Sequence, residues 1–361
     1  MKKLSSNVFK LIFTISITLI AILFTEEAIS KQGPPVYVDI YGTRKLSPED
    51  IKNRFGGDMV ALANLYLNKD GLPSQSDRKR MDPLQKKIKS GINSMGEFSY
   101  LNISLMKFPT NKAAYITIDV VDKEDTQRRL NHFLAKPGST ISDPDSLIAL
   151  EKEYQEIGNA KYFREKTPLV KLTSCPAFNC TLGFDAPELK KYAGIFNTLV
   201  PKNKDRLIKM LREDKDAEKR ANATLLLAHI KDGDELIKIL MTSMQDADTK
   251  VRSSAMQVLT GTLYTLKKYD FPIEKVIDAL DRPDLEERNK ALTLLYVLSM
   301  QSGNAQYIKV HAKEQLIVQL KMEQPYVHDQ AYLILQQISG IKFGDRDYEA
   351  WENWLNTTKT S

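Results

Sequence analysis

The chain offers few residues whose types and spacing could support catalysis. None of its histidines has a second histidine four residues away or stands in an HExxH motif. They are His132, His229, His311 and His328. Ser76 and Lys79 match the SxxK spacing of penicillin-binding enzymes, but the accompanying motifs are missing. The GxSxG, phosphate-loop and GxGxxG patterns are missing too, so the sequence predicts no catalytic residue, no metal site and no cofactor.

Cys175 and Cys180 are the two cysteines of the chain. Their spacing is not that of a CxxC motif, and a closed structural zinc site needs four ligands, so we do not expect metal binding. In an oxidising compartment a local disulfide is expected. Closing so short a loop stabilises a fold by ~2 kcal/mol. Free or redox-active thiols are the alternative.

The N-terminus has the parts of an export signal. Residues 1–10 are basic, residues 11–24 are apolar or carry hydroxyls, and the small residues Ala28 and Ser30 suit cleavage after Ser30. The apolar run is shorter than the ~20 residues that span a bilayer, so cleavage is expected, with an uncleaved inner-membrane anchor as the alternative. No later stretch is apolar enough to cross a membrane, and we expect no membrane segment in the mature chain.

A helical-hairpin pattern recurs four times between residues 203 and 340. Each copy begins with three apolar residues at i, i+1 and i+4, which share one helical face. These triplets are Leu207, Ile208 and Leu211; Leu236, Ile237 and Leu240; Val276, Ile277 and Leu280; and Leu316, Ile317 and Leu320. A second helix follows in each copy, with Arg or His three residues before an Ala that allows close packing. These pairs are Arg220 and Ala223, Arg252 and Ala255, Arg288 and Ala291, and His328 and Ala331.

These residues resemble HEAT repeats, a group that includes the HEAT-like repeats of bilin lyases. The resemblance covers residues 202–340 and implies an all-α solenoid whose hairpins share one core and present their second helices on a concave side. HEAT arrays mostly bind proteins. The candidate protein-binding face consists of polar second-helix residues: Lys219, Asn222, Ser253, Ser254, Asn289 and Lys290.

In three of the copies an Asp stands four residues before the Arg. The pairs are Asp216 and Arg220, Asp248 and Arg252, and Asp284 and Arg288. A carboxylate at the start of a helix caps free N–H groups and can pair with a cation one turn later. We therefore interpret this ladder as structural, and a row of binding groups is the alternative. Gln324 and His328 take these places in the fourth copy, where we expect the ladder to end.

Upstream of the repeats, the pattern predicts a small α+β unit. We expect a strand at 36–40, a helix from 47 to 67 broken at Gly56-Gly57, a helix at 83–95, and strands at 97–108 and 113–122. In the last strand Ile116, Ile118 and Val120 point one way, while Thr117 and Asp119 point the other.

Three segments of this unit are similar to POTRA domains: Ile40-Tyr41-Gly42, Ser94 to Ile103, and Ile116 to Asp125. The resemblance implies a periplasmic location and clients that add a strand to an edge of the sheet. POTRA domains usually occur in several copies that lead into an outer-membrane barrel, and only one copy is recognised here. A direct role in barrel insertion is therefore not expected.

The features together predict an α+β chain in five parts. They are an export signal (1–30), a β-α-α-β-β POTRA-like domain (31–125), a linker and helical cap with the disulfide loop (126–201), four HEAT-like repeats (202–340), and a C-terminal capping helix (341–361). In that last helix Trp351 and Trp354 share a face. The combination resembles a group of exported bacterial HEAT-repeat proteins, which implies no particular activity.

Charge is dispersed along the 361 residues, whose net charge is +6. The densest basic run, 78–89, lacks interleaved aromatic residues, so we expect no nucleic-acid partner. We expect a non-enzymatic periplasmic scaffold that binds a protein partner in the cell envelope. Its role would be in the assembly or maintenance of the envelope. The alternative is an envelope enzyme with a site in the cap, around Tyr192 and the disulfide loop.

Overall fold

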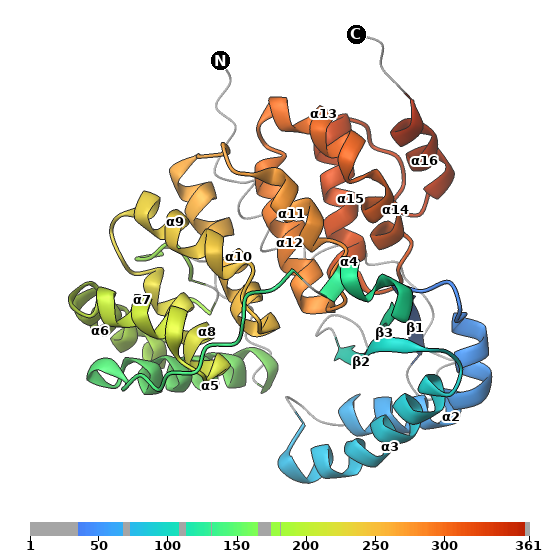
Figure 1. Ribbon diagram of the computed structural model, residues 1–361, viewed down its shortest axis with the longest axis horizontal. Helices are drawn as coiled ribbons and strands as arrows, with labels where there is room; N and C mark the ends of the chain where they lie inside the picture. The colour runs from blue at the N-terminus through green and yellow to red at the C-terminus, as the bar shows by residue number, and fades with distance from the viewer. Residues whose placement is uncertain are drawn as a thin grey trace.

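The fold combines a small sheet with a long series of helices. Figure 1 shows the computed structural model, which describes residues 35–67, 73–107, 113–130, 132–164, 175–180 and 182–357. The sheet and its two helices come first in the chain and the helical series follows, so the α+β class is confirmed. The predicted export signal lies outside the described residues. Within the described part, no helix combines the length and the apolar character that crossing a bilayer requires.

The sheet has three strands in the order β1-β3-β2. Strand β1 (Val36–Tyr41) runs parallel to β3 (Ala114–Asp122), and β2 (Phe98–Lys107) runs antiparallel to β3. Helices α2 (Pro48–Leu67) and α3 (Gln75–Asn93) connect β1 to β2. The predicted order of strand, helix, helix, strand, strand is therefore confirmed.

Two details of these helices differ from the prediction. Helix α2 continues through Gly56 and Gly57, because burial of its apolar face against the sheet outweighs the ~1 kcal/mol that each glycine costs a helix. Helix α3 begins at Gln75, earlier than expected, because a capping box starts it there. The Ser74 hydroxyl accepts the Asp77 N–H at 3.2 Å, and the Asp77 carboxylate accepts the Ser74 N–H at 3.1 Å.

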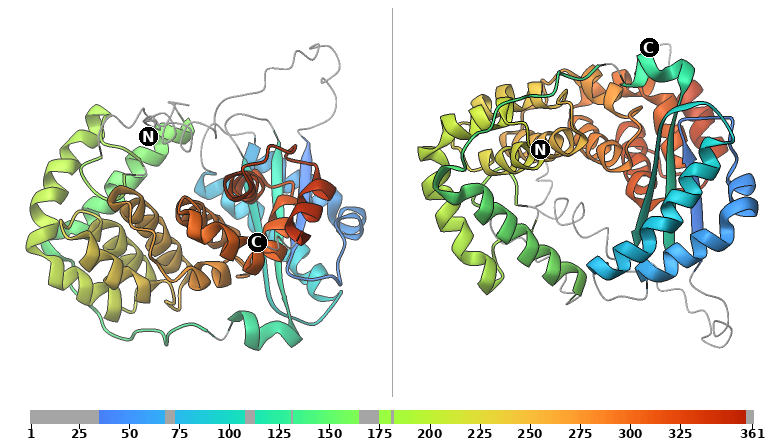
Figure 2. Two further views of the ribbon diagram at one scale, coloured as in Figure 1. Left: turned by 90° about the horizontal axis from the view of Figure 1, so that it is seen from above. Right: turned by 60° about the horizontal axis from the view of Figure 1, so that its bottom comes forward.

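Strand β3 is buried on both faces along its whole length. Ile116, Ile118 and Val120 join the core beneath α2 and α3, as the alternation predicts. The opposite face carries Asp119, which contacts Arg288 in the helical series. The sheet is therefore a middle layer, with its own two helices on one side and the helical series on the other (Figure 2).

Four pairs of helices make up most of the series. They are α7 (Lys204–Glu213) with α8 (Ala217–Leu227), α9 (Gly233–Ser243) with α10 (Thr249–Leu266), α11 (Ile273–Ala279) with α12 (Leu285–Leu298), and α14 (Lys313–Leu320) with α15 (Pro325–Ser339). The second helices lie side by side in chain order, and one contiguous core runs through all four pairs. Helix α13 (Ser302–His311) is inserted before the last pair. The series forms a solenoid-like arc (Figure 2).

Both ends of the arc are covered by further helices. Helices α5 (Leu147–Arg164) and α6 (Pro187–Lys202) pack on α8 at the first end. Helix α16 (Tyr348–Asn356) covers the last pair and packs on α14. Trp351 of α16 is fully buried, and its indole N–H donates to the Gly344 carbonyl oxygen at 2.9 Å. This contact fits the capping role expected of the C-terminal helix.

An extended segment, residues 132–143, connects the sheet unit to α5, and we call it the strap. The Leu134 N–H donates to the Gln245 carbonyl oxygen at 2.7 Å, and the Ser139 N–H donates to the Glu213 carbonyl oxygen at 3.0 Å. Because these acceptors lie in the turns of the second and then the first helix pair, the strap runs backward along the arc (green in Figure 1). The remaining short helices are η1 (Lys123–Asp125), α4 (Thr126–Leu130) and η2 (Pro144–Ser146).

Candidate functional site: the cleft on the inner side of the arc

The aspartates of the predicted ladder cap the second helices. Each accepts a hydrogen bond from a backbone N–H of the first turn: Asp216 from Glu218 at 2.9 Å, Asp248 from Lys250 at 2.9 Å, and Asp284 from Glu287 at 3.0 Å. These bonds satisfy N–H groups that the helix itself leaves without partners. The capping part of the prediction is therefore confirmed.

The ladder arginines bond to the following helix pair, and the expected pairing one turn back is wrong. Arg220 donates to both carboxylate oxygens of Asp246, at 3.0 and 2.6 Å. Arg252 donates to both oxygens of Glu287, at 2.6 and 2.7 Å. A guanidinium group matches a carboxylate in this two-bonded geometry, and in the stacked helices Asp246 and Glu287 present both oxygens to it. Each buried pair therefore joins one helix pair to the next.

Arg288 occupies the same place in the third pair, but its partner is in the sheet. Its Nη2 atom lies 2.8 Å from Asp119 Oδ1, and its guanidinium lies 3.7 Å from the centre of the Tyr41 ring. Burial raises the pKa of Asp119 to about 6, although the charge of Arg288 opposes that shift. In the fourth pair His328 bonds instead to the Leu320 carbonyl oxygen, at 2.6 Å. The sheet thus takes the position of a next repeat for Arg288.

Further contacts fix the sheet unit against the third and fourth helix pairs. The Asp39 carboxylate accepts the backbone N–H groups of Glu323 and Gln324, both at 2.9 Å. Arg129 is buried and donates from Nε to the Asp281 carbonyl oxygen at 2.9 Å. Because buried charged and polar groups of each part contact the other part here, the sheet unit packs directly on the arc.

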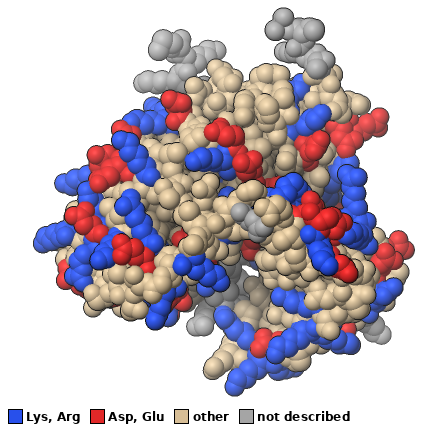
Figure 3. Space-filling view, viewed as in Figure 1, with Lys and Arg blue, Asp and Glu red and all other residues tan. Residues whose placement is uncertain are grey.

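A cleft of about 450 Å³ lies between α5 and the second helices, on the inner side of the arc. Its lining includes Glu151 and Gln155 of α5, Asn222 of α8, Ser254 and Gln257 of α10, and Leu182 and Phe184 after the disulfide loop. Figure 3 shows that the molecular surface is hollowed between the lobe containing α5 and α8 and the lobe containing α3. On that view Lys and Arg are interspersed with Asp and Glu.

A buried carboxyl group and two amides are linked by hydrogen bonds in this cleft. The Gln155 Nε2 group donates to Glu151 Oε1 at 3.0 Å and to Asn222 Oδ1 at 3.1 Å. Glu151 is 5% exposed, and burial raises its pKa to about 8 although the Gln155 hydrogen bond opposes that shift. Glu151 therefore carries a proton at neutral pH and acts as an uncharged group in the cleft wall.

His229 and a cluster of aromatic rings form the floor beneath these groups. The His229 Nδ1 atom is 2.8 Å from Asn197 Oδ1, and the imidazole packs edge-on against Phe184 and Phe196. Burial lowers the pKa of His229 to about 4, so the ring is neutral at physiological pH. Tyr192, the centre of the alternative enzyme site, is fully buried within the same cluster.

The six residues of the predicted binding face do not lie together. Asn222 and Ser254 line the cleft. Lys219 is at the edge of the arc, where its Nζ group donates to the Ile141 carbonyl oxygen of the strap at 3.1 Å. Its contribution is therefore to hold the strap.

The other three residues of that face are engaged within the fold. Ser253 is buried, and the Asn289 Nδ2 group donates to the Tyr326 carbonyl oxygen of the next helix pair. Lys290 is half-buried, and burial lowers its pKa. The sequence reasoning missed Glu151 and Gln155, because α5 carries no repeat signature. A polar Glu and Gln one turn apart within an apolar helix face were the available signal.

The predicted disulfide between Cys175 and Cys180 is present. Its loop is seated on the arc, because the Phe178 N–H donates to the Ala228 carbonyl oxygen at 3.0 Å. The Phe178 carbonyl oxygen lies so close to α10 that a Cβ atom added to Gly261 would be 2.0 Å from it. A glycine is therefore needed at that point of α10 for the loop to border the cleft.

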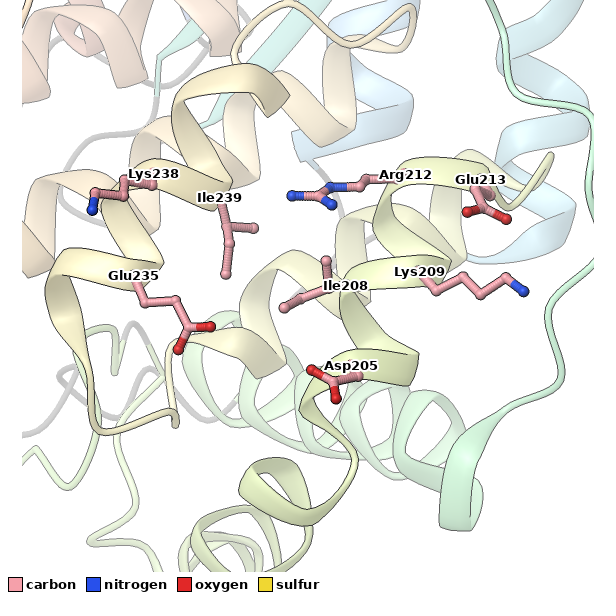
Figure 4. Close-up of a pocket in the computed structure, with 8 residues that line it drawn as sticks. All are labelled: Asp205, Ile208, Lys209, Arg212, Glu213, Glu235, Lys238 and Ile239. Atoms are coloured by element: carbon pink, nitrogen blue, oxygen red, sulfur yellow. The ribbon is translucent and has the colours of Figure 1, made fainter.

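A second depression, of about 660 Å³, lies on the outer side between α7 and α9. It is lined by Asp205, Ile208, Lys209, Arg212, Glu213, Glu235, Lys238 and Ile239. Figure 4 shows Ile208 and Ile239 in the middle of this groove with charged side chains of both signs around them. These charged groups are largely exposed, in contrast with Glu151 and Asn222 in the inner cleft.

Comparison of the chain with known protein families, with curated proteins and with solved structures finds no match. Among the residues that the structure describes, no group of three or more His, Cys, Asp or Glu side chains is arranged to hold a metal ion.

Proposed function

We propose that this chain is an exported periplasmic scaffold that binds a protein partner on the inner side of a HEAT-like array. The observation that carries the proposal is the composition of the cleft, because α5 and three successive second helices, α8, α10 and α12, all contribute to it. A continuous surface built from neighbouring hairpins suits an extended partner, since each hairpin adds a further increment of contact.

The periplasmic location is supported by two features of the chain. The disulfide between Cys175 and Cys180 suits an oxidising compartment, and the N-terminal sequence has the pattern of an export signal. The order of strands and helices in the sheet unit, which resembles that of POTRA domains, supports a place in envelope assembly or maintenance.

The sheet unit offers a second site of contact. Strand β2 is at the edge of the sheet and is only partly buried along most of its length. An incoming strand could pair with such an edge through main-chain hydrogen bonds. We therefore assign the inner cleft to the client and the β2 edge to an envelope complex.

Mild crosslinking in envelope extract, followed by pull-down of the full chain, tests the scaffold. A Ser254→Arg variant fills the cleft with a large charged side chain, and Thr242→Arg places the same side chain on the exposed outer helix α9. We expect Ser254→Arg to lose a partner that wild type and Thr242→Arg both retain. Equal recovery of every crosslinked protein from the three baits would contradict the proposal.

An envelope enzyme remains the second candidate, and Glu151 is the observation that favours it. A carboxyl group with a pKa of about 8 can act as a general acid at neutral pH, and His229 lines the same cleft. Turnover of an envelope metabolite that is abolished by Glu151→Gln, with no partner in the crosslinking experiment, would favour the enzyme.

A further inference from the structure

We propose that the cleft recognises the main chain of an extended, uncharged peptide segment through the side-chain amides of Gln155 and Asn222. The inference rests on the proposed function, and it specifies which part of the protein client the cleft holds. Four features of the cleft support it: the hydrogen bonds inside, the charge at the rim, the packing of the aromatic rings and the length.

The hydrogen bonds of Gln155 with Glu151 and Asn222 leave one acceptor group and one donor group of the two amides for a ligand. Both hydrogens of the Gln155 amide nitrogen are used, one on Glu151 and one on Asn222. The Gln155 carbonyl oxygen and the Asn222 amide nitrogen have no other partner among the described residues. An amide acceptor next to an amide donor matches the N–H and C=O groups that an extended residue presents along one edge.

In the part of the chain that the structure describes, the charges at the rim of the cleft balance. The exposed charged residues there are two cations and two anions: Lys152, Lys250, Glu218 and Glu286. Lys152 and Glu218 also form an ion pair at 3.7 Å. The carboxyl group in the wall, Glu151, is protonated at neutral pH. A phosphate or carboxylate ligand would therefore gain little from this site, whereas an uncharged peptide group loses no charge hydration on entering it.

The aromatic rings of the cleft favour a peptide over a sugar. Tyr154 and Phe184 are each 6% exposed, and they stack on one another with ring centres 5.0 Å apart. The Tyr154 hydroxyl donates to the Gly183 carbonyl oxygen at 2.9 Å. Because these ring faces are covered by each other, they offer no open platform on which a pyranose ring could stack.

The length of the segment follows from the spacing of the helices. The lining reaches from Asn222 on α8 to Glu286 at the start of α12, which covers two steps between neighbouring second helices. Packed helices are about 8–10 Å apart, so two steps span roughly 16–20 Å. An extended chain advances about 3.3 Å per residue, and the cleft therefore accommodates about five or six residues.

The test is selection of a phage-displayed heptapeptide library on the immobilised full chain. The best peptides are then synthesised with blocked termini, and their affinities are measured by fluorescence anisotropy. We expect Gln155→Leu and Asn222→Leu each to weaken binding by about tenfold or more, as the loss of a buried hydrogen bond to a ligand implies. Gln306→Leu, on the exposed side of α13, should leave the affinity unchanged.

Two further measurements keep the proposal falsifiable if a buried substitution disturbs the fold. Ser254→Val changes a half-buried cleft residue and should also weaken binding. Methylating the peptide nitrogens one at a time should weaken binding at one or more positions, although every side chain is retained. The inference would be overturned if the selected peptides bound Asn222→Leu as tightly as wild type and if every N-methylated peptide bound wild type as tightly as its unmethylated parent.

The same experiments separate this inference from the scaffold proposal. If the crosslinked envelope partner depends on Ser254 but no heptapeptide is enriched, main-chain recognition is wrong and the scaffold stands. If neither a partner nor a peptide binds, both proposals fail. If the chain binds chitotriose and Asn222→Leu abolishes that binding, the ligand of the cleft is a glycan and not a peptide.

Discussion

Glu151 is the cleft residue whose ionisation most affects stability. Its pKa is about 8 in the folded chain and near 4.5 when exposed, so the folded state retains a proton that the unfolded state releases between these values. The stability that this proton provides is fully present below pH 4.5 and is lost as pH rises toward 8. Glu151→Gln should therefore stabilise the protein at pH 8, on the order of 2–4 kcal/mol, and much less at pH 5.

Urea unfolding at pH 5, 6.5 and 8 measures this difference. Glu156→Gln, on the exposed side of the same helix, is the matched control and should show no such dependence on pH. A Glu151→Gln variant whose stability follows that of wild type at all three pH values would mean that the carboxyl group is ionised in the folded state.

The ladder shows which residue roles can be read from local sequence. Asp216 was correctly predicted as a cap, because a cap bonds to N–H groups two or three residues away. The partner of Arg220 was not predictable in this way, because Asp246 belongs to the next helix pair. A guanidinium group reaches several acceptors, and the spacing in sequence does not say which carboxylate lies opposite it once the helices are stacked.

The buried pair between Arg252 and Glu287 is expected to stabilise the junction of the second and third helix pairs. Arg252→Met removes the two-bonded partner of a fully buried carboxylate and leaves it Arg282 and the Thr249 hydroxyl, so we expect a loss of ~3–5 kcal/mol. The double variant Arg252→Met and Glu287→Met should recover part of that loss, since it removes the unpaired carboxylate but also takes away the carboxylate partner of Arg282. Denaturant unfolding of wild type, the two single variants and the double variant measures the coupling free energy between Arg252 and Glu287. If the losses of the two single variants add up to that of the double variant, the two residues are not coupled.

At the scale of elements, Gly261 determines how the disulfide loop sits on α10. Alanine normally stabilises a helix interior relative to glycine, by ~1 kcal/mol. At Gly261 we expect the opposite sign and a loss of ~1–3 kcal/mol, because the new methyl group would collide with the Phe178 carbonyl oxygen. Gly194→Ala, in α6 with open space around it, is the control and should stabilise.

Thermal unfolding gives the sign of both changes, and the rate of reduction of the Cys175–Cys180 bridge reports on the loop. We expect faster reduction in Gly261→Ala than in Gly194→Ala, because the displaced loop exposes the bridge. Two alanine variants of equal stability and equal reduction rate would show that the loop is not held against α10.

The elements themselves were largely predictable, because the four apolar triplets and the start of each second helix are local patterns. The strap was predicted only as part of a linker. Residues 132–143 have no regular period, and their backbone groups bond to the turns of the arc instead of to each other. Such a segment takes its conformation from the turns that it contacts in the folded arc. A local sequence pattern carries no information about those contacts.

At the scale of the whole molecule, the first part of the chain packs against the last part of the arc. The sheet unit packs at the last helix pairs, the strap returns along the arc, and α5 and α6 begin the arc at its other end (Figures 1 and 2). The sequence could not indicate this arrangement. Thr117 and Asp119 alternate with apolar residues, which is the usual pattern of a strand with one solvated face, yet that face is buried against the arc.

The pair between Asp119 and Arg288 is therefore expected to help hold the sheet unit on the arc, beside the contacts of Asp39 and Arg129. Asp119→Ala leaves the Arg288 guanidinium buried without its carboxylate, and we expect a loss of ~3–5 kcal/mol. Because the lost contact lies between the two parts, amide hydrogen exchange should accelerate in β3 and α12 before it does so in α8. Asp125→Ala, which breaks a more exposed pair with Arg128, should leave the exchange pattern unchanged.

Adding Arg288→Met to Asp119→Ala should restore much of the protection, since no unpaired charge then remains between sheet and arc. Equal exchange in β3 for wild type and Asp119→Ala would mean that the other contacts, including those of Asp39 and Arg129, hold the sheet unit without this pair.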